Sequence, residues 1–194
     1  MPIVKTERFK EYIRVLRKTL PEARVSHCIF VAEYIASFAE SIGVDHDKAV
    51  TAGLLHDLCR TLDNATMLAR AQEYGIPVSA TQADRPMILH GPVAAAECAN
   101  RLGIEDAEIC EAIACHTTGK AGFGRLAQAL YVADYAEPTR KYPEAAQTRE
   151  ILRHEGFDEA LYYVATQKVT HVREKGILDP ATEHFYLWIQ EHFG

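Results

Sequence analysis

The chain has 194 residues, of which 48% are hydrophobic and 25% are charged, and its formal net charge is −6. This length predicts a single domain over residues 1–194 with a sizeable core. Lysine and arginine form no basic run or stripe, so we expect no nucleic-acid polymer as partner. No apolar run is long enough to span a bilayer and the start of the chain lacks the apolar stretch of a signal peptide, so we expect no membrane partner. The five cysteines form no Cys-x-x-Cys pair, which favours the reducing cytoplasm.

Apolar residues recur at steps of three and four along most of the chain, which is typical of helices that bury one face. The pattern is clear from Cys28 through Val31 and Ile35 to Phe38, and Gly43 ends that segment. In chain order we expect helices at about 25–42, 45–58, 63–74, 92–102, 105–116, 124–136, 144–154, 157–175 and 180–192. The segments 76–86 and 117–124 are expected to be irregular. No alternation of strand length stands between turn signals, so the predicted fold class is all-α.

Six histidines and aspartates lie at ends or on inner faces of these expected helices: His27, His56, Asp57, His90, His116 and Asp134. A single histidine is more often a packing or surface residue than a ligand, and an isolated His-Asp pair is common by chance. The aspartates carry more weight, because an ionised carboxylate in an apolar stripe is costly unless it is paired or bound to a metal. No lysine or arginine is expected at helical pairing distance on that side. A divalent cation held by imidazoles and carboxylates is then the simplest compensation.

The order of these six residues resembles that of the HD-domain superfamily of metal-dependent phosphohydrolases. The surrounding segments resemble the bacterial YqeK family more closely. They are Arg24-Val-Ser-His27, Gly53-Leu-Leu-His-Asp57, Ile88-Leu-His90-Gly-Pro-Val93, Cys115-His-Thr-Thr-Gly-Lys120 and Tyr131-Val-Ala-Asp-Tyr-Ala-Glu-Pro138. The resemblance covers about residues 8 to 182, with one departure at Cys28, where the family usually has a hydroxyl residue. The resemblance implies an HD-domain helical bundle with additional C-terminal helices. It also implies an enzyme that cuts diadenosine tetraphosphate symmetrically into two ADP.

The resemblance also implies roles for individual residues. An iron ion, replaceable by manganese or cobalt, would be held by His27, His56, Asp57 and Asp134. The implied catalytic residues are Asp57, His90 and His116, and the two histidines would face the phosphates or hold a second divalent metal. The nucleotide would contact His27, Asp57, His90, His116 and Asp134 together with Arg24, Thr117, Arg140, Leu178, Pro180 and Thr182. The last three belong to the segment from Ile177 to Thr182, which would close over the nucleotide.

For the mechanism we expect Asp57 to orient the nucleophile for in-line displacement at phosphorus. If they are protonated, His90 and His116 would spread the phosphate charge together with Arg24 and Arg140. Glu137, before Pro138, would either order Arg140 or cap the end of its helix.

Two other classes of function fit the same residues. The metal set could serve another chemistry, such as that of a di-iron oxygenase or a cyclic-nucleotide phosphodiesterase, but no Gly-Tyr-Pro signature of the cyclic-dinucleotide branch occurs. A non-catalytic binding module predicts gaps among the six residues, and the sequence has none. The hydrolase hypothesis is therefore favoured. The apolar C-terminal helix is also compatible with a homodimer.

Overall fold

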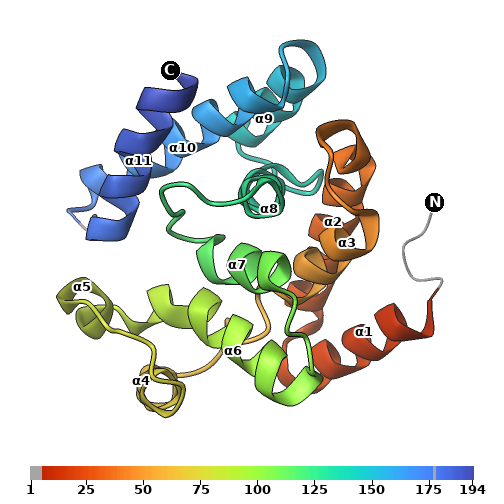
Figure 1. The fold of residues 1–194 in the computed structure, drawn as a ribbon, viewed down its shortest axis with the longest axis vertical. Coiled ribbons are helices and arrows are strands. Elements are labelled where there is room, and N and C mark those ends of the chain that lie inside the picture. Colours follow the sequence, from red (N-terminus) through yellow and green to blue (C-terminus); the bar gives the residue numbers. More distant parts are fainter. Residues whose placement is uncertain (1–5, 177) are drawn as a thin grey trace.

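The computed structural model of the protein describes residues 6–176 and 178–194 (Figure 1). Within these residues there are eleven α-helices, two 3₁₀ helices and no strand, so the predicted all-α class is confirmed. The α-helices are α1 (Glu7–Thr19), α2 (Glu22–Phe38), α3 (His46–Leu55), α4 (Asn64–Glu73), α5 (Ala80–Asp84), α6 (His90–Leu102), α7 (Ala107–Cys115), α8 (Arg125–Ala136), α9 (Pro143–His154), α10 (Phe157–Glu174) and α11 (Pro180–Phe193). The 3₁₀ helices are η1 (Glu40–Ile42) and η2 (Pro86–Leu89).

Helix α8 lies at the centre of the molecule (Figure 1), where it contacts α2, α3, α7, α9 and α10. Its residues from Leu126 to Ala133 are all buried, as expected for a helix that is apolar around its whole circumference. A hydrophobic core cluster extends from Phe9 in α1 to Ile189 in α11. Because Asp134 lies in the last turn of α8, this central helix brings a carboxylate into the interior.

Helices α2 and α3 approach each other through small residues. A Cβ atom added to Gly53 of α3 would lie 2.6 Å from Cα of Ala32 in α2, which is closer than any real contact allows. The glycine therefore permits a separation between the two helices that no other residue would. This contact holds the end of α3, where His56 follows, beside the part of α2 that carries His27.

The nine predicted helices are present, but several of their ends differ. The segment expected at 25–42 is divided into α2 and η1, and the helix expected to reach residue 58 ends at Leu55. Helix α1 was not predicted, although Thr6 caps it and Phe9, Ile13 and Leu16 form its buried face.

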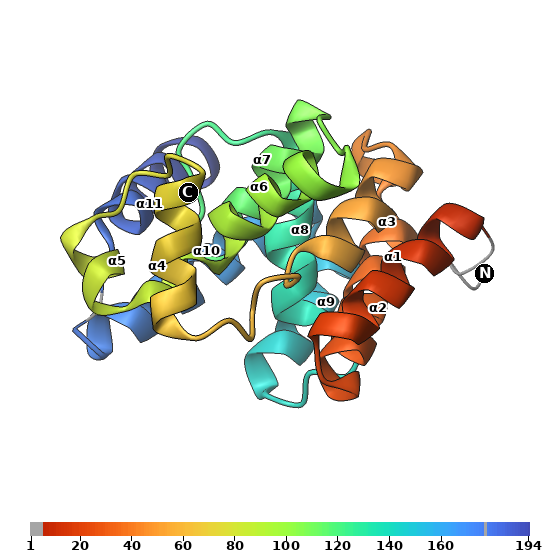
Figure 2. The same cartoon turned by 90° about the horizontal axis from the view of Figure 1, so that it is seen from below.

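The segment 76–86 was predicted to be irregular, and this prediction is wrong in part, because the segment contains α5 and the first residue of η2. Ser79 begins α5 with a capping box, in which its side chain and that of Gln82 each accept a hydrogen bond from the other's backbone N–H. In Figure 2, α1 and α5 lie at opposite ends of the molecule, and α11 lies on the side of α5. None of the helices in the described ranges is both long and apolar enough to cross a membrane.

Candidate metal and phosphate site

Three histidines of the site stand at helix ends. His56, His90 and His116 are the C-cap residues of α3, η2 and α7. In each, Nδ1 lies 2.6 to 2.8 Å from the carbonyl oxygen three residues earlier, in the last turn of the helix that the histidine ends. Carbonyl groups of a last turn lack helical donors, and a carbonyl can only accept, so Nδ1 carries the proton. Each ring therefore directs the other nitrogen, Nε2, into the interior.

The fourth histidine, His27, is oriented by a carboxylate. Its Nδ1 lies 3.3 Å from Oε1 of Glu137, which is 1% exposed. Glu137 also accepts hydrogen bonds from the backbone N–H and the hydroxyl of Thr139, and its Oε1 lies 3.6 Å from Nε of Arg140. Sequence reasoning considered Glu137 only as a partner of Arg140 or a helix cap. Its contact with His27 gives it a further structural role, because a carboxylate on Nδ1 fixes the ring and directs Nε2 to a point 3.1 Å from Oδ1 of Asp134.

The carboxylate of Asp57 lies between two pairs of imidazoles. Its Oδ2 is 3.5 Å from Nε2 of His56 and 3.9 Å from Nε2 of His27. Its Oδ1 is 3.2 Å from Nε2 of His90 and 3.7 Å from Nε2 of His116. Asp57 is 3% exposed, so each of its oxygens faces one pair within the protein interior.

The two imidazoles on the Oδ1 side contact each other. Nε2 of His90 and Nε2 of His116 are 3.0 Å apart. Both Nδ1 atoms already donate to carbonyl groups, so the two Nε2 atoms need a proton or another cation between them. The hydroxyl of Thr117 lies 3.2 Å from both Nε2 atoms and adds a polar contact at the same place.

Arginines approach both aspartates, contrary to the sequence expectation. Nη1 of Arg24 lies 2.9 Å from Oδ2 of Asp57, and Nη2 of Arg140 lies 3.0 Å from Oδ1 of Asp134. Nε of Arg60, three residues after Asp57, is 3.9 Å from its Oδ1. The prediction that no basic residue lies at pairing distance is therefore wrong. Arg24 comes from α2 and Arg140 from the turn after α8, so neither contact follows helical spacing. The case for a metal then rests on the imidazole nitrogens rather than on unpaired carboxylates.

Burial and neighbouring charges shift the pKa values of the cluster. Burial alone would raise the pKa of Asp57 and Asp134, but the neighbouring histidines lower both below the usual range. Burial would likewise lower the pKa of His56, yet Asp57 and Asp134 raise it. For His116 burial prevails and lowers the pKa to about 4. A pKa this low favours the neutral ring of His116 at pH 7.

The fit of these residues to a metal ion can be judged from one atom. Nε2 of His56 is buried and has no hydrogen-bond partner within the described part of the chain. An unpaired buried polar atom costs about 1–3 kcal/mol, which a bound cation would remove. Three groups of three side chains in the described residues have donor atoms within 4.8 Å of one another. They are His27, His56 and Asp134; Asp57, His90 and His116; and Cys28, His56 and Asp57. Imidazole nitrogen and carboxylate oxygen are ligands that divalent transition metals prefer, so the residues fit such an ion.

Two cavities next to the cluster contain several of the predicted substrate residues. A cleft of about 540 Å³ is lined by Arg24, His27 and Arg140, among others. A mostly apolar pocket of about 270 Å³ is lined by Thr117 and Thr182. The structure thus brings both basic residues of the prediction to one cavity and both threonines to another.

The segment before α11 reaches the second pocket only in part. Asp179, which was not predicted, lines the pocket, caps α11 through the N–H of Ala181, and accepts a hydrogen bond of 2.9 Å from the hydroxyl of Ser79. Leu178 is half-buried and Pro180 is exposed, and neither lines these two cavities. Their contact with a nucleotide stays a prediction, and Ile177 lies outside the described residues.

Lys168 on α10 lies next to the cluster but was not singled out from the sequence. Its Nζ donates a hydrogen bond of 3.1 Å to the carbonyl of His116 and lies 3.7 Å from the centre of the Tyr131 ring. Burial lowers the pKa of Lys168 to about 8, although Asp134 acts in the opposite direction. No motif surrounds this lysine in the sequence, so no local signal could have identified it.

Comparisons with known proteins find one matching family model, several sequence relatives and a solved structure of similar fold. The HD domain model matches residues 24–139. A symmetrical bis(5′-nucleosyl)-tetraphosphatase of Staphylococcus aureus is 34% identical over 84% of each protein. A Bacillus subtilis protein of the same name is 26% identical, and the match covers 93% of this chain and 96% of that protein. The fold is similar to a structure described as a predicted HD superfamily hydrolase involved in NAD metabolism from Clostridium acetobutylicum. Its TM-score is 0.89 at 24% identity, with 94% of this chain and 97% of that one covered.

Proposed function

The chain belongs to the HD-domain family, and from this premise we propose that it hydrolyses dinucleoside tetraphosphates. The relatives from S. aureus and B. subtilis are named as symmetrical enzymes of this class. On diadenosine tetraphosphate, symmetrical cleavage breaks the central anhydride and releases two ADP. The observation that carries the proposal is the buried cluster of histidine and aspartate donors, with Arg24 and Arg140 beside it.

HD domains depend on a metal, and the proposed ligands here are His27, His56, Asp57 and Asp134. We propose iron, with manganese or cobalt as substitutes, because His27, His56 and Asp134 form a set of two imidazoles and one carboxylate that is typical of iron(II) sites. When bound, such an ion supplies an activated water at neutral pH and neutralises phosphate oxygens. His90 and His116 are proposed to hold a second divalent ion. Burial lowers the pKa of His116, and the lone pair of a neutral Nε2 suits a metal ion better than direct contact with a phosphate oxygen.

The chain's own groups position the reacting atoms. Asp57, with one oxygen toward each pair of imidazoles, is proposed to orient the attacking water opposite the leaving ADP, as in-line displacement requires. Arg24 and Arg140 are proposed to bind non-bridging phosphate oxygens. Their side chains are 33% and 32% exposed, so each guanidinium can contact both its aspartate and a ligand in the cleft. Thr117 and Thr182 are proposed to contact the nucleotide in the smaller pocket, with Leu178 and Pro180 beside it.

We also propose that residues 1–194 act as one hydrolase domain, since a core cluster joins α1 to α11. All five cysteines are free thiols and four of them are buried, which supports the cytoplasm as the proposed location. The proposed homodimer would use α11, where Leu187 is 56% exposed.

The function is tested by offering the purified, metal-loaded protein diadenosine tetraphosphate beside ATP, dGTP and cyclic dinucleotides, with the products separated by chromatography. We expect ADP to be the product formed from the dinucleotide. Asp57→Ala should lower the rate by ~10³-fold or more, because it removes the carboxylate whose two oxygens face the two pairs of imidazoles.

Asp84→Ala is the matched control, because the Asp84 side chain is 79% exposed and lies outside the cluster. It should leave the rate unchanged. Formation of ATP and AMP from the dinucleotide would contradict symmetrical cleavage. If the protein turns over no phosphate substrate with iron, manganese or cobalt, the alternative of a non-catalytic binding module is favoured instead.

A further inference from the structure

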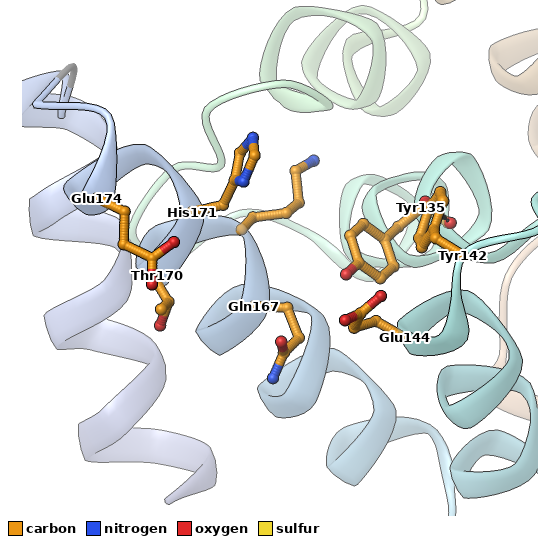
Figure 3. Close-up of a pocket in the computed structure, with 8 residues that line it drawn as sticks. Tyr135, Tyr142, Glu144, Gln167, Thr170, His171 and Glu174 are labelled. Carbon is orange, nitrogen blue, oxygen red and sulfur yellow. Dashed lines mark hydrogen bonds between the residues drawn. The ribbon is translucent and has the colours of Figure 1, made fainter.

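A cleft of about 580 Å³ lies between α10 and the region where α8 ends and α9 begins (Figure 3). In Figure 3 the side chains of Tyr135 and Glu144 point toward α10, which contributes Gln167 and His171 to the opposite wall, and Tyr142 lies beside Tyr135. Neither the sequence motifs nor the proposed metal site gives this cleft a role. Its volume lies within the range of about 300–1,000 Å³ that is usual for pockets that bind small molecules.

The walls of this cleft suit a nucleoside better than a chain of phosphates. The rings of Tyr135 and Tyr142 lie with their centroids 5.2 Å apart at 69° to each other, and aromatic faces of this kind stack on bases. Glu144 and Gln167 provide hydrogen-bonding groups for ribose hydroxyls and base edges. Glu144 and Glu174 would repel phosphate, so the phosphate end of a nucleotide has to lie away from both.

Lys168 stands where such a phosphate end would fit. It lines the cleft and donates to the carbonyl of His116, so the ammonium group lies between the cleft and the metal-binding cluster. Lys168 and His171 also line the pocket of Thr117 and Thr182. The two cavities therefore share a wall on α10, and the ammonium group of Lys168 lies at that wall.

We propose that the 580 Å³ cleft binds the second nucleoside of the substrate, with its phosphates directed toward Lys168. This inference rests on the proposed function, because a symmetrical substrate carries one nucleoside on each side of the bond that breaks. In-line displacement sends the leaving half away from the attacking oxygen, so both halves need room beside one reacting centre. The pocket of Thr117 and Thr182 serves one half, and the cleft across the shared wall serves the other.

The test compares diadenosine tetraphosphate with adenosine tetraphosphate, which carries a single nucleoside. Gln167 is half-buried on α10, and Gln167→Trp would fill the cleft without touching the metal-binding cluster. We expect the ratio of kcat/KM for the two substrates to fall about tenfold, because one stacked nucleoside is lost. The matched control is Gln147→Trp at an exposed position of α9 outside the cleft, which should keep the wild-type ratio.

Equilibrium dialysis with ADP in the presence of manganese provides a second measurement. The wild type should bind two ADP per chain and Gln167→Trp should bind one. An unchanged ratio of kcat/KM, or an equal fall for both substrates, overturns the second subsite while the hydrolase function stands. A wild type that binds one ADP also overturns it. Absence of dinucleotide turnover by the wild type would overturn the proposed function instead, and the ADP count would still decide whether the subsite exists.

Discussion

At the scale of single residues, the chemistry of the site depends on which ring nitrogen of each histidine carries the proton. His56, His90 and His116 each donate from Nδ1 to a carbonyl of the preceding helical turn, and His27 donates to Glu137. All four rings thus direct Nε2 toward the aspartates. For His56, His90 and His116 the partner is a carbonyl only three residues earlier in the chain. The partner of His27 is Glu137, which lies far along the chain.

Glu137→Ala should weaken metal binding. The substitution removes the carboxylate that fixes the His27 ring, and loss of such a partner typically lowers metal affinity about 10–100-fold. Isothermal titration with manganese measures this change. Glu137→Gln should restore most of the affinity, because its amide oxygen can accept the same hydrogen bond.

Glu155→Ala, at an exposed position after α9, is the control and should bind metal like the wild type. Wild-type affinity in Glu137→Ala would mean that His27 does not need this carboxylate.

The residues of the cluster could be predicted from the sequence, because each lies within a short recognisable segment. The contacts that orient them could only partly be predicted. Glu137 is 110 residues away from His27, and Lys168 is 52 residues away from His116. Likewise, Arg24 contacts Asp57 across 33 residues. Helical periodicity reports only on neighbours within one or two turns, so such partners become visible in the folded chain alone.

At the scale of elements, the site depends on how closely α2 and α3 approach each other. The contact between Gly53 and Ala32 places the rings of His27 and His56 5.3 Å apart between centroids. The same glycine supplies the carbonyl that accepts from His56. One small residue therefore determines both the separation of two helices and the orientation of the His56 ring.

Gly53→Ala should destabilise the protein by about 1–3 kcal/mol, because the added methyl group would overlap the backbone of Ala32. Urea denaturation followed by circular dichroism measures the free energy of unfolding. Gly124→Ala is the control, since a methyl group there meets only the flexible carboxylate of Glu111, at 3.2 Å. If both variants unfold at the same urea concentration, the close contact between Gly53 and Ala32 does not contribute to the stability of the protein as we expect.

Most elements could be predicted from apolar spacing, whereas their ends could not. Helix α3 ends at Leu55 because the next residue, His56, becomes its C-cap, although the apolar pattern continues through Leu58. Helix α5 has only five residues, too few for a periodic pattern, and depends on the capping box at Ser79. Such ends are determined by individual hydrogen bonds rather than by hydrophobicity.

At the scale of the whole molecule, the donor groups connect separate parts of the fold. His27 comes from α2, His56 and Asp57 follow α3, and Asp134 comes from α8. His90 is the first residue of α6, and His116 follows the end of α7. An ion bound by these groups would therefore stabilise the packing of most of the bundle, because the unfolded chain cannot hold the donors together.

Removal of metal should lower the midpoint of thermal unfolding. At an ion concentration of about 100 times Kd, binding adds about 2.7 kcal/mol, which corresponds to roughly 5–10 °C for a chain of this size. Calorimetry with chelator and with added manganese measures the difference. His56→Ala should abolish the shift, because it removes the one ligand nitrogen in the described ranges that is buried without a partner.

His154→Ala, whose ring is 66% exposed, is the control and should keep the full shift. If manganese raises the unfolding midpoint of His56→Ala as much as that of the wild type, the ion binds elsewhere.

The hydrogen bond between Ser79 and Asp179 has a consequence for access to the pocket of Thr117 and Thr182. Ser79 caps α5 and Asp179 caps α11, and each keeps its own backbone contact through an atom or lone pair that the shared bond does not use. The bond can therefore break without unwinding either helix, at a net loss of about 0.5–1.5 kcal/mol. The hydrogen bond between α5 and the start of α11 therefore adds little to the stability of the pocket rim, because each helix keeps its own cap when the bond breaks.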